Sequence, residues 1–222
     1  YIALAGVGAT AAAVTVESGS LAKLLSACVF PAGLSMVILA GSELFTGNCL
    51  MVMALLERRI TPAQLLRNWL TVYLGNAVGG AAVAALAVYS HTASLFGDGL
   101  ARSMVSIAES KAALGAGDAF LRGVLCNFLV CLAVWMAAAS KRAEGKVIAL
   151  FFPILLFVLC GYEHCIANLY YLPAGAFAAA EYGMETTLTL AGCLKNLAAV
   201  TLGNLVGGAA LGVGYRFAYL KE

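Results

Sequence analysis

One apolar stretch of 34 residues, Val147 to Ala180, constrains the possible folds of this chain most strongly, because its only charged or histidine side chains are the adjacent Glu163 and His164. A straight helix rising about 1.5 Å per residue would make it roughly 50 Å long, against roughly 30 Å of bilayer hydrocarbon. The stretch is therefore predicted to break between Gly161 and Asn168. Ionisable groups near mid-membrane line cavities and avoid lipid, so the break is also the predicted functional site.

An earlier apolar stretch, Leu24 to Leu56, has the same design, with one charged residue in 33. Both stretches contain the pattern Gly-x-Glu-x-x-x-x-Asn, which begins at Gly41 in the first and at Gly161 in the second. After the glutamate comes Leu44 in the first copy and His164 in the second. The pattern indicates a duplicated scaffold in which the second half is specialised.

The composition indicates an all-α integral membrane protein. Apolar residues make up 63% of the 222 residues and charged residues 11%, with a mean hydropathy of +0.94, far outside the range of soluble domains. The net charge of +2 does not favour binding to nucleic acid. The chain begins at Tyr1 inside an apolar run, so we expect its N-terminus to be truncated. Seven cysteines without a C-x-x-C pair are expected to be reduced packing residues, and no metal or cofactor is predicted.

Six segments are expected to cross the membrane as helices, the second and the fifth of them broken: 1–16, 24–56, 68–90, 123–140, 147–180 and 196–215. A hydroxyl cap at Thr61 and a proline at position 62 are expected to start the helix of the third span. The more polar segment 91–122 is expected to hold a surface helix at the membrane face.

An internal repeat supports this division. Residues 68–82 align without gaps on residues 196–210, with ten identities in fifteen positions. Each unit then holds three spans, and an odd number of spans inserts the second copy upside down. We therefore expect a single transmembrane domain, 1–222, made of two inverted repeats, 1–90 and 91–222.

The basic residues predict which side of the membrane each loop occupies, because short cytoplasmic loops carry the excess of Lys and Arg. Cytoplasmic termini place eight basic residues inside and five outside. The inner group is Arg58, Arg59, Arg67, Lys141, Arg142, Lys146, Arg216 and Lys221, and the outer group is Lys23, Arg102, Lys111, Arg122 and Lys195. The prediction is a multi-pass protein of the cell membrane with both termini in the cytoplasm.

The polar residues of the two breaks have different expected roles. Glu43 and Glu163 are expected to hold the loops by accepting hydrogen bonds from backbone amides, and Asn48 and Asn168 to cap the half-helices that follow. His164 has no counterpart in the first copy, and its chemistry suits a proton donor to a solute in transit. Small-xxx-small pairs at Gly75/Gly79, Gly203/Gly207 and Gly208/Gly212 indicate close helix packing, within one subunit or between subunits.

The chain resembles the formate/nitrite transporter family at residues 41–48, 125–136 and 161–168, and the resemblance extends from the first span to the sixth. Many members have serine after the loop histidine, where this chain has Cys165. The resemblance implies an aquaporin-like protomer of six helices in a homopentamer, with one pore per protomer for a small monovalent anion. The anion it implies is formate, nitrite or hydrosulfide.

Residue roles also follow from the resemblance. It implies that His164 is the pore histidine, with Thr46 and Asn127 as polar neighbours, and that Lys111 is the vestibule lysine. The residues that fall at its two apolar constrictions are Phe30, Leu34, Leu44, Phe45, Val130 and Phe157. The corresponding hypothesis is capture of the anion in a basic vestibule followed by passage, at least in part, as the neutral acid, because a bare anion loses much hydration energy in an apolar constriction.

Two other classes of function compete with this interpretation. An aquaporin-like pore for neutral solutes also uses two half-helices, but its Asn-Pro-Ala pair is replaced here by residues 48–50, Asn-Cys-Leu, and 168–170, Asn-Leu-Tyr. An intramembrane enzyme would use His164 and Cys165 as base and nucleophile, but adjacent residues seldom point at each other and no third orienting group is evident. The sequence does not favour an enzyme.

Overall fold

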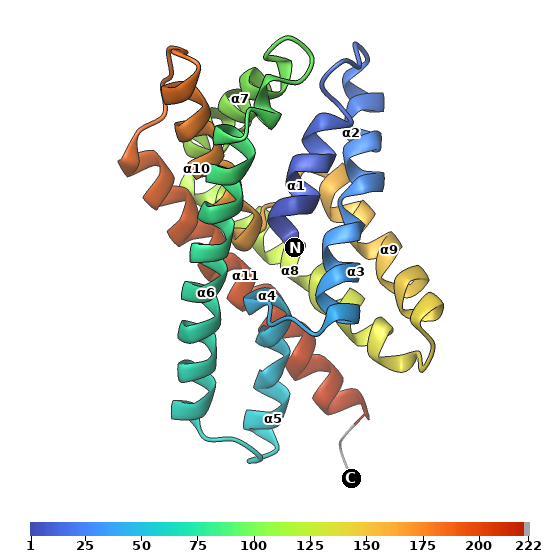
Figure 1. Cartoon of the computed structure of the whole chain (residues 1–222). Helices are drawn as coiled ribbons and strands as arrows, with labels where there is room; N and C mark the ends of the chain where they lie inside the picture. The colour runs from blue at the N-terminus through green and yellow to red at the C-terminus, as the bar shows by residue number, and fades with distance from the viewer. Residues whose placement is uncertain (220–222) are drawn as a thin grey trace.

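The computed structural model describes residues 1–219, and within these residues the chain is helical, with no strand. Figure 1 shows the helices as a bundle in which several cross the molecule from end to end. The elements are α1 (Ile2–Ala11), α2 (Gly19–Val29), α3 (Pro31–Ala40), α4 (Phe45–Asn48), η1 (Cys49–Met51), α5 (Val52–Leu56), α6 (Pro62–Tyr89), η2 (Thr92–Ser94), α7 (Gly99–Ala113), α8 (Ala116–Ala139), α9 (Ala143–Leu159), α10 (Cys165–Glu181) and α11 (Leu190–Tyr219).

Four helical segments of the described chain are long and apolar enough to cross a membrane, which makes this a multi-pass membrane protein. They are Gly19–Ala40, formed by α2 and α3 together, Pro62–Tyr89, Ala116–Ala139 and Leu190–Tyr219. The first predicted span corresponds to the ten residues of α1, and the fifth to α9 and α10, with 17 residues each. The arrangement as six spans in two inverted repeats stays a prediction.

Both predicted breaks are present. The second apolar stretch is interrupted between α3 and α4, and the fifth between α9 and α10. Gly41 (φ +78°) and Gly161 (φ +69°) adopt left-handed backbone conformations at these points, which glycine accepts without steric cost. The second stretch is also divided at Pro31, which starts α3 and has no N–H group to continue the hydrogen bonding of α2.

The segment before the fourth span contains the expected helix, α7, and one face of this helix is buried in the protein. Leu100, Met104 and Ala108 of α7 are buried, and α7 packs along α10. A Cβ atom added at Gly175 of α10 would lie 2.9 Å from the carbonyl oxygen of Met104, so the two helix backbones are in close contact. Arg102, Ser106 and Ser110 of α7 are exposed, which explains why the sequence of this segment looks like that of a surface helix.

The helix of the third span begins as predicted. Thr61 and Gln64 form a reciprocal capping box, with Pro62 at the first helical position. Glycines also bring α8 and α11 together, because side chains at Gly203 and Gly207 would clash with the carbonyl oxygens of Phe120 and Val124. This predicted packing therefore lies within the subunit. Gly75 and Gly79 have no atom within 4 Å of an added Cβ.

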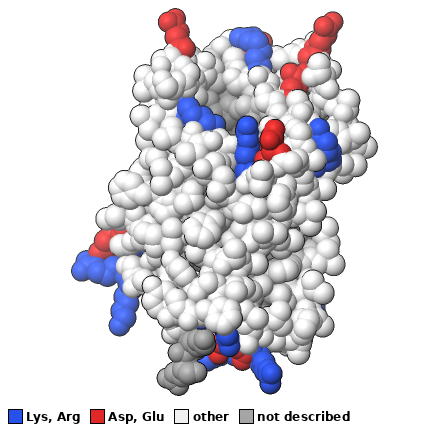
Figure 2. Space-filling view, turned by 180° about the vertical axis from the view of Figure 1, so that it is seen from behind, with Lys and Arg blue, Asp and Glu red and all other residues white. Residues whose placement is uncertain are grey.

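The seven cysteines are free thiols, and Cys49, Cys126, Cys131 and Cys165 are buried in helix contacts. Figure 2 shows charged side chains gathered toward the two ends of one face of the molecule, with a band free of charge between them. Such a band matches the hydrocarbon of a bilayer. Lys221, which contributes to the predicted charge bias, lies outside the described residues.

Candidate functional site

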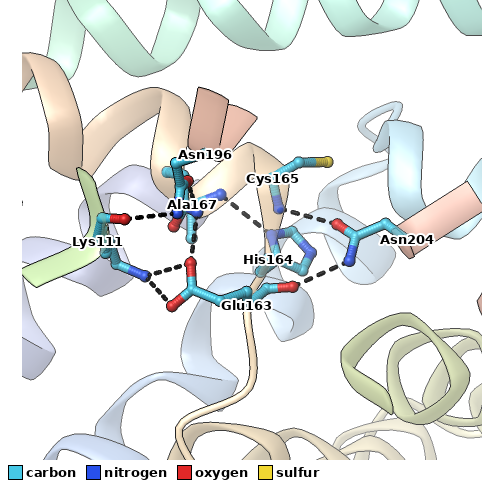
Figure 3. A network of polar contacts seen from close by, with 8 residues as sticks. Lys111, Glu163, His164, Cys165, Ala167, Asn196 and Asn204 are labelled. Carbon is cyan, nitrogen blue, oxygen red and sulfur yellow. Dashed lines mark hydrogen bonds and ion pairs between the residues drawn. The ribbon is translucent and has the colours of Figure 1, made fainter. Parts of the chain in front are cut away.

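Asn204 of α11 closes the break between α9 and α10 (Figure 3). Its side-chain oxygen accepts a hydrogen bond from the backbone N–H of Cys165 at 2.9 Å, and its nitrogen donates to the carbonyl oxygens of Glu163 at 2.9 Å and Gly123 at 2.8 Å. The loop has left the helical hydrogen-bonding pattern, so its buried backbone groups need such partners. One fully buried amide side chain thus satisfies both ends of the loop.

Asn76 of α6 makes the equivalent contacts at the first break. Its side-chain oxygen accepts from the backbone N–H of Phe45 at 3.1 Å, and its nitrogen donates to the carbonyl oxygen of Glu43 at 3.1 Å. Asn76 and Asn204 are the ninth residues of the two aligned fifteen-residue segments. Equivalent residues therefore hold the two loops.

A second polar motif also occurs in both copies. In each, the asparagine five residues after the glutamate donates from its side-chain nitrogen to that glutamate and to an asparagine of a long helix. The second copy uses Glu163, Asn168 and Asn196, at 2.7 and 2.8 Å, and the first uses Glu43, Asn48 and Asn68, the last at 2.9 Å from Asn48. The first asparagine of each fifteen-residue repeat, at 68 and 196, thus joins the network.

These contacts correct two details of the sequence prediction. Asn48 and Asn168 do not cap the half-helices, because they lie one turn inside α4 and α10, and the cap of α10 is His164. The hydrogen bonds described for the glutamate carboxylates come from side chains, whereas the loop amides bind the asparagines of α6 and α11. The physical reason is that a residue five positions after the glutamate has completed a helical turn and faces back toward it.

Lys111 of α7 makes the second copy different from the first. Its Nζ atom lies 2.9 Å and 3.1 Å from the two carboxylate oxygens of Glu163, and the two side chains are only 15% and 6% exposed. The backbone oxygen of Lys111 also accepts a hydrogen bond from Asn196 at 2.9 Å. Within residues 1–219, Glu43 has no such cationic partner. The ammonium of Lys111 is therefore part of a neutral buried pair.

His164 joins the two breaks, which lie 118 residues apart in the chain. Its Nε2 atom is 2.9 Å from the hydroxyl of Thr46, and its Nδ1 atom accepts the backbone N–H of Ala167 at 3.1 Å. A backbone N–H can only donate, so Nδ1 is unprotonated in this bond and the neutral ring carries its hydrogen on Nε2, toward Thr46. The imidazole caps α10 with one nitrogen and presents a donor with the other.

Asn127 of α8 contacts backbone atoms next to the hydrogen-bonded pair of Thr46 and His164. Its side-chain nitrogen donates to the carbonyl oxygens of Thr46 at 3.2 Å and of Asn204 at 2.7 Å. Thr46 and Asn127 are fully buried, and His164 is 3% exposed. The structure thus brings the three predicted polar residues together, with Asn127 positioned to hold Thr46.

Three cavities lie in sequence along the molecule and share lining residues. The largest, about 640 Å³, is lined by residues from α1, α2, α7, α9 and α10 and reaches His164. Phe30, Phe157 and His164 also line the next cavity, which is only about 10 Å³. Ile2 and Leu44 are common to that cavity and the third, of about 250 Å³. The cavities outline a path with a narrow, apolar centre.

Five of the six residues predicted at apolar constrictions line the narrow central cavity: Phe30, Leu34, Leu44, Val130 and Phe157. The rings of Phe30 and Phe157 meet edge to face with centroids 5.6 Å apart, and the ring of Phe157 stacks on His164 at 5.8 Å. Phe45 lies outside this cavity, because it packs against Trp69 and Tyr73 of α6 at 6.4 and 5.0 Å.

Several residues of the site were not predicted from the sequence. Ile2 and Ile154 line the central cavity, and no polar or repeated signal marks them within their apolar helices. Asn76 and Asn204 had a detectable signal, because they are identical positions of the internal repeat. An asparagine that recurs in an apolar helix needs a hydrogen-bonding partner in the membrane, and a loop nearby provides one.

Comparisons with known proteins agree with this architecture. A family model described as formate/nitrite transporter matches residues 1–218. A probable formate transporter of Methanothermobacter thermautotrophicus is 39% identical over 218 residues, covering 91% of this chain and 77% of its own. The formate channel FocA of Haemophilus influenzae is 39% identical over 211 residues, covering 89% and 74%.

Solved structures show the same fold. A pentameric formate channel with formate bound has a TM-score of 0.86 at 31% identity, covering 99% of this chain and 92% of its own. An ion channel of the FNT family has a TM-score of 0.84 at 32% identity, covering 98% and 88%. On this evidence the chain belongs to the formate/nitrite transporter family, a family of channels and transporters and not of enzymes.

Proposed function

We propose that this protein conducts formate across the cell membrane, with nitrite and hydrosulfide as the other candidate anions. The observation that carries the proposal is the row of three cavities, because it provides a path whose narrowest part contains one polar side chain, His164, among apolar ones. The likeness to a solved channel with formate bound supports formate as the first substrate to test.

The proposed mechanism follows from the cost of desolvation. A bare anion loses several kcal/mol or more of hydration energy in an apolar constriction, whereas a small neutral acid loses much less. The anion enters the large cavity, reaches His164, and passes Phe30 and Phe157 hydrogen-bonded to the imidazole or as the neutral acid. Thr46 receives the Nε2 hydrogen when no solute is present.

The hydrogen bond from the Ala167 N–H to Nδ1 limits the protonation states that His164 can adopt. Protonation of Nδ1 would remove its acceptor lone pair and break the hydrogen bond from Ala167. The resting ring is therefore a neutral group that donates a hydrogen bond through Nε2 and keeps its proton. In our proposal, an anion that crosses as the neutral acid takes its proton from hydronium in the large cavity, which reaches His164.

We also propose that the protomer has six spans in two inverted repeats, 1–90 and 91–222, and that both termini are cytoplasmic. The matching asparagine networks of the two breaks support the repeat. With cytoplasmic termini, the large cavity opens to the outside, because Figure 1 places α7 and the tops of α1 and α2 at the end opposite to the end of α11.

Parallel uptake of formate, nitrite and hydrosulfide into proteoliposomes tests the proposal. We expect formate to enter faster than into liposomes without protein. Faster entry of one of the other two anions would change the substrate and keep the mechanism. Entry of none of them, together with fast water permeation, would favour a pore for neutral solutes.

A further inference from the structure

Three basic side chains line the large cavity, and their surroundings differ. Lys111 is paired with Glu163 at 2.9 Å. Arg102 donates from its guanidinium to the carbonyl oxygen of Gly97 at 2.7 Å. Among residues 1–219, Lys23 has no carboxylate within ion-pair distance and its ammonium donates no hydrogen bond to the protein. The ammonium of Lys23 is therefore the one most available to a solute.

Lys23 is the first of three residues on one face of α2 that line the large cavity. Lys23, Ser26 and Phe30 all face the large cavity, and their spacing of three and then four residues places them along one face of the helix. Phe30 ends this row at the narrow central cavity. An anion held at Lys23 would need to move only along this face to reach Phe30 and His164.

The resemblance implies that Lys111 is the vestibule lysine, but Glu163 neutralises the charge of Lys111 in the large cavity. The Lys111 and Glu163 pair is neutral as a unit, whereas Lys23 is exposed and Arg102 is not balanced by a described carboxylate. A cleft with low-dielectric walls focuses the field of an uncompensated charge and concentrates ions of the opposite sign.

We propose that Lys23, and not the paired Lys111, supplies the charge that draws a small anion into the large cavity and holds it before His164. Lys111 then acts as a positioning residue, which keeps Glu163 and the second break in place. This inference rests on the proposed function, because it concerns the same path and the same class of anion. It adds a binding residue outside the three motifs that carry the family resemblance.

Initial rates of formate uptake by Lys23→Gln proteoliposomes test the inference. At low salt, the half-saturating formate concentration should rise about 10-fold, at the lower end of electrostatic focusing. The difference from the wild type should shrink at high salt, because the Debye length falls to roughly 3 Å at 1 M. The matched control is Lys195→Gln, which removes the same charge from a separate cavity beside α11 and should behave as the wild type.

Each outcome has a distinct meaning. Equal half-saturation in Lys23→Gln, Lys195→Gln and the wild type would overturn the inference while leaving the function intact. A wild type no faster than empty liposomes would instead overturn the proposed function. The double variant Lys111→Gln/Glu163→Gln keeps the net charge of the cavity, so a rise in its half-saturation without one in Lys23→Gln would assign capture to the pair and contradict us.

Discussion

At the scale of single residues, buried amide side chains determine whether the broken helices can exist in a membrane. Asn204 satisfies the N–H of Cys165 and the carbonyl of Glu163, and all three residues are buried. Asn76 does the same for the other loop, where Glu43 is exposed. The two asparagines therefore make the same two loop contacts with different solvent access, and Asn204 also donates to the carbonyl oxygen of Gly123.

This difference predicts unequal effects of two matched substitutions. Asn204→Ala should lower stability by about 2–4 kcal/mol, because each orphaned buried group costs about 1–3 kcal/mol. Asn76→Ala should cost less, because water reaches its loop. Apparent melting temperatures in detergent would measure both, and equal losses would show that solvent access does not decide the cost.

The buried pair of Lys111 and Glu163 gives a second prediction at this scale. Lys111→Met should lower stability by about 3–5 kcal/mol, because it leaves an unpaired carboxylate that is almost completely buried. The double variant Lys111→Met/Glu163→Gln should lose less than Lys111→Met alone, since the glutamine amide carries no charge and still accepts from Asn168. A thermal-shift double-mutant cycle measures this coupling, and strictly additive losses would exclude it.

At the scale of helices and loops, α7 is tied to the connection between α10 and α11. One carboxylate oxygen of Glu109 accepts hydrogen bonds from the backbone N–H of Thr187 at 2.6 Å and from the hydroxyls of Thr186 and Thr187 at 2.9 and 3.1 Å. The Thr187 N–H is the main reason that the pKa of Glu109 lies below its ordinary value of 4.5. This clasp is exposed, in contrast to the buried residues Glu163 and His164 of the second break.

The lowered pKa predicts a pH dependence of this clasp. A carboxyl with a lowered pKa in the folded protein stabilises the closed state fully above its ordinary pKa, and this stabilisation is lost as the pH falls through the lowered value. Hydrogen exchange in residues 182–189 should therefore be slow near neutral pH and accelerate, relative to intrinsic rates, below 4.5. Glu109→Gln should exchange fast throughout, and protection equal to that of the wild type would contradict the assignment.

At this scale, the sequence predicts some features of the helices and loops and not others. The two breaks were predictable, because a carboxylate beside a glycine in a long apolar stretch is costly unless the helix opens there. The burial of α7 was not, since its polar residues line a cavity and the sequence does not distinguish cavity water from bulk water. The packing of Phe45 against α6 was not predictable either, because the pattern does not reveal whether a helix face meets the path or a neighbouring helix.

At the scale of the whole molecule, the two breaks have similar contacts and differ in charge. Both breaks have the same asparagine contacts, yet Lys111 faces only the second, and the large cavity holds three basic side chains while the opposite one holds Glu43. Figure 2 shows the charged ends on one face, separated by an apolar band. The proposed path therefore has two unlike entrances.

Exposed apolar residues on the outer surface of α6 predict that the protein assembles into an oligomer. Leu66, Leu70, Leu74 and Val78 on α6 are each more than half exposed, and Gly75 and Gly79 next to them leave room for a close neighbour. Together with the pentameric channel of the same fold, this supports a homopentamer. Native mass spectrometry from detergent should show five copies. A stable monomer that transports formate would contradict this prediction.

The central claim is that His164 assists a small acid through the apolar constriction, and formate uptake by His164→Asn across a range of external pH tests it most directly. Asparagine is a good helix cap, so this variant should keep the bond to Ala167 and the fold while losing the Nε2 donor. We expect its flux to fall at least about tenfold near neutral pH. The remaining flux should follow the neutral acid, increasing about tenfold for each unit of decrease in pH. Flux and pH dependence equal to those of the wild type would contradict the account.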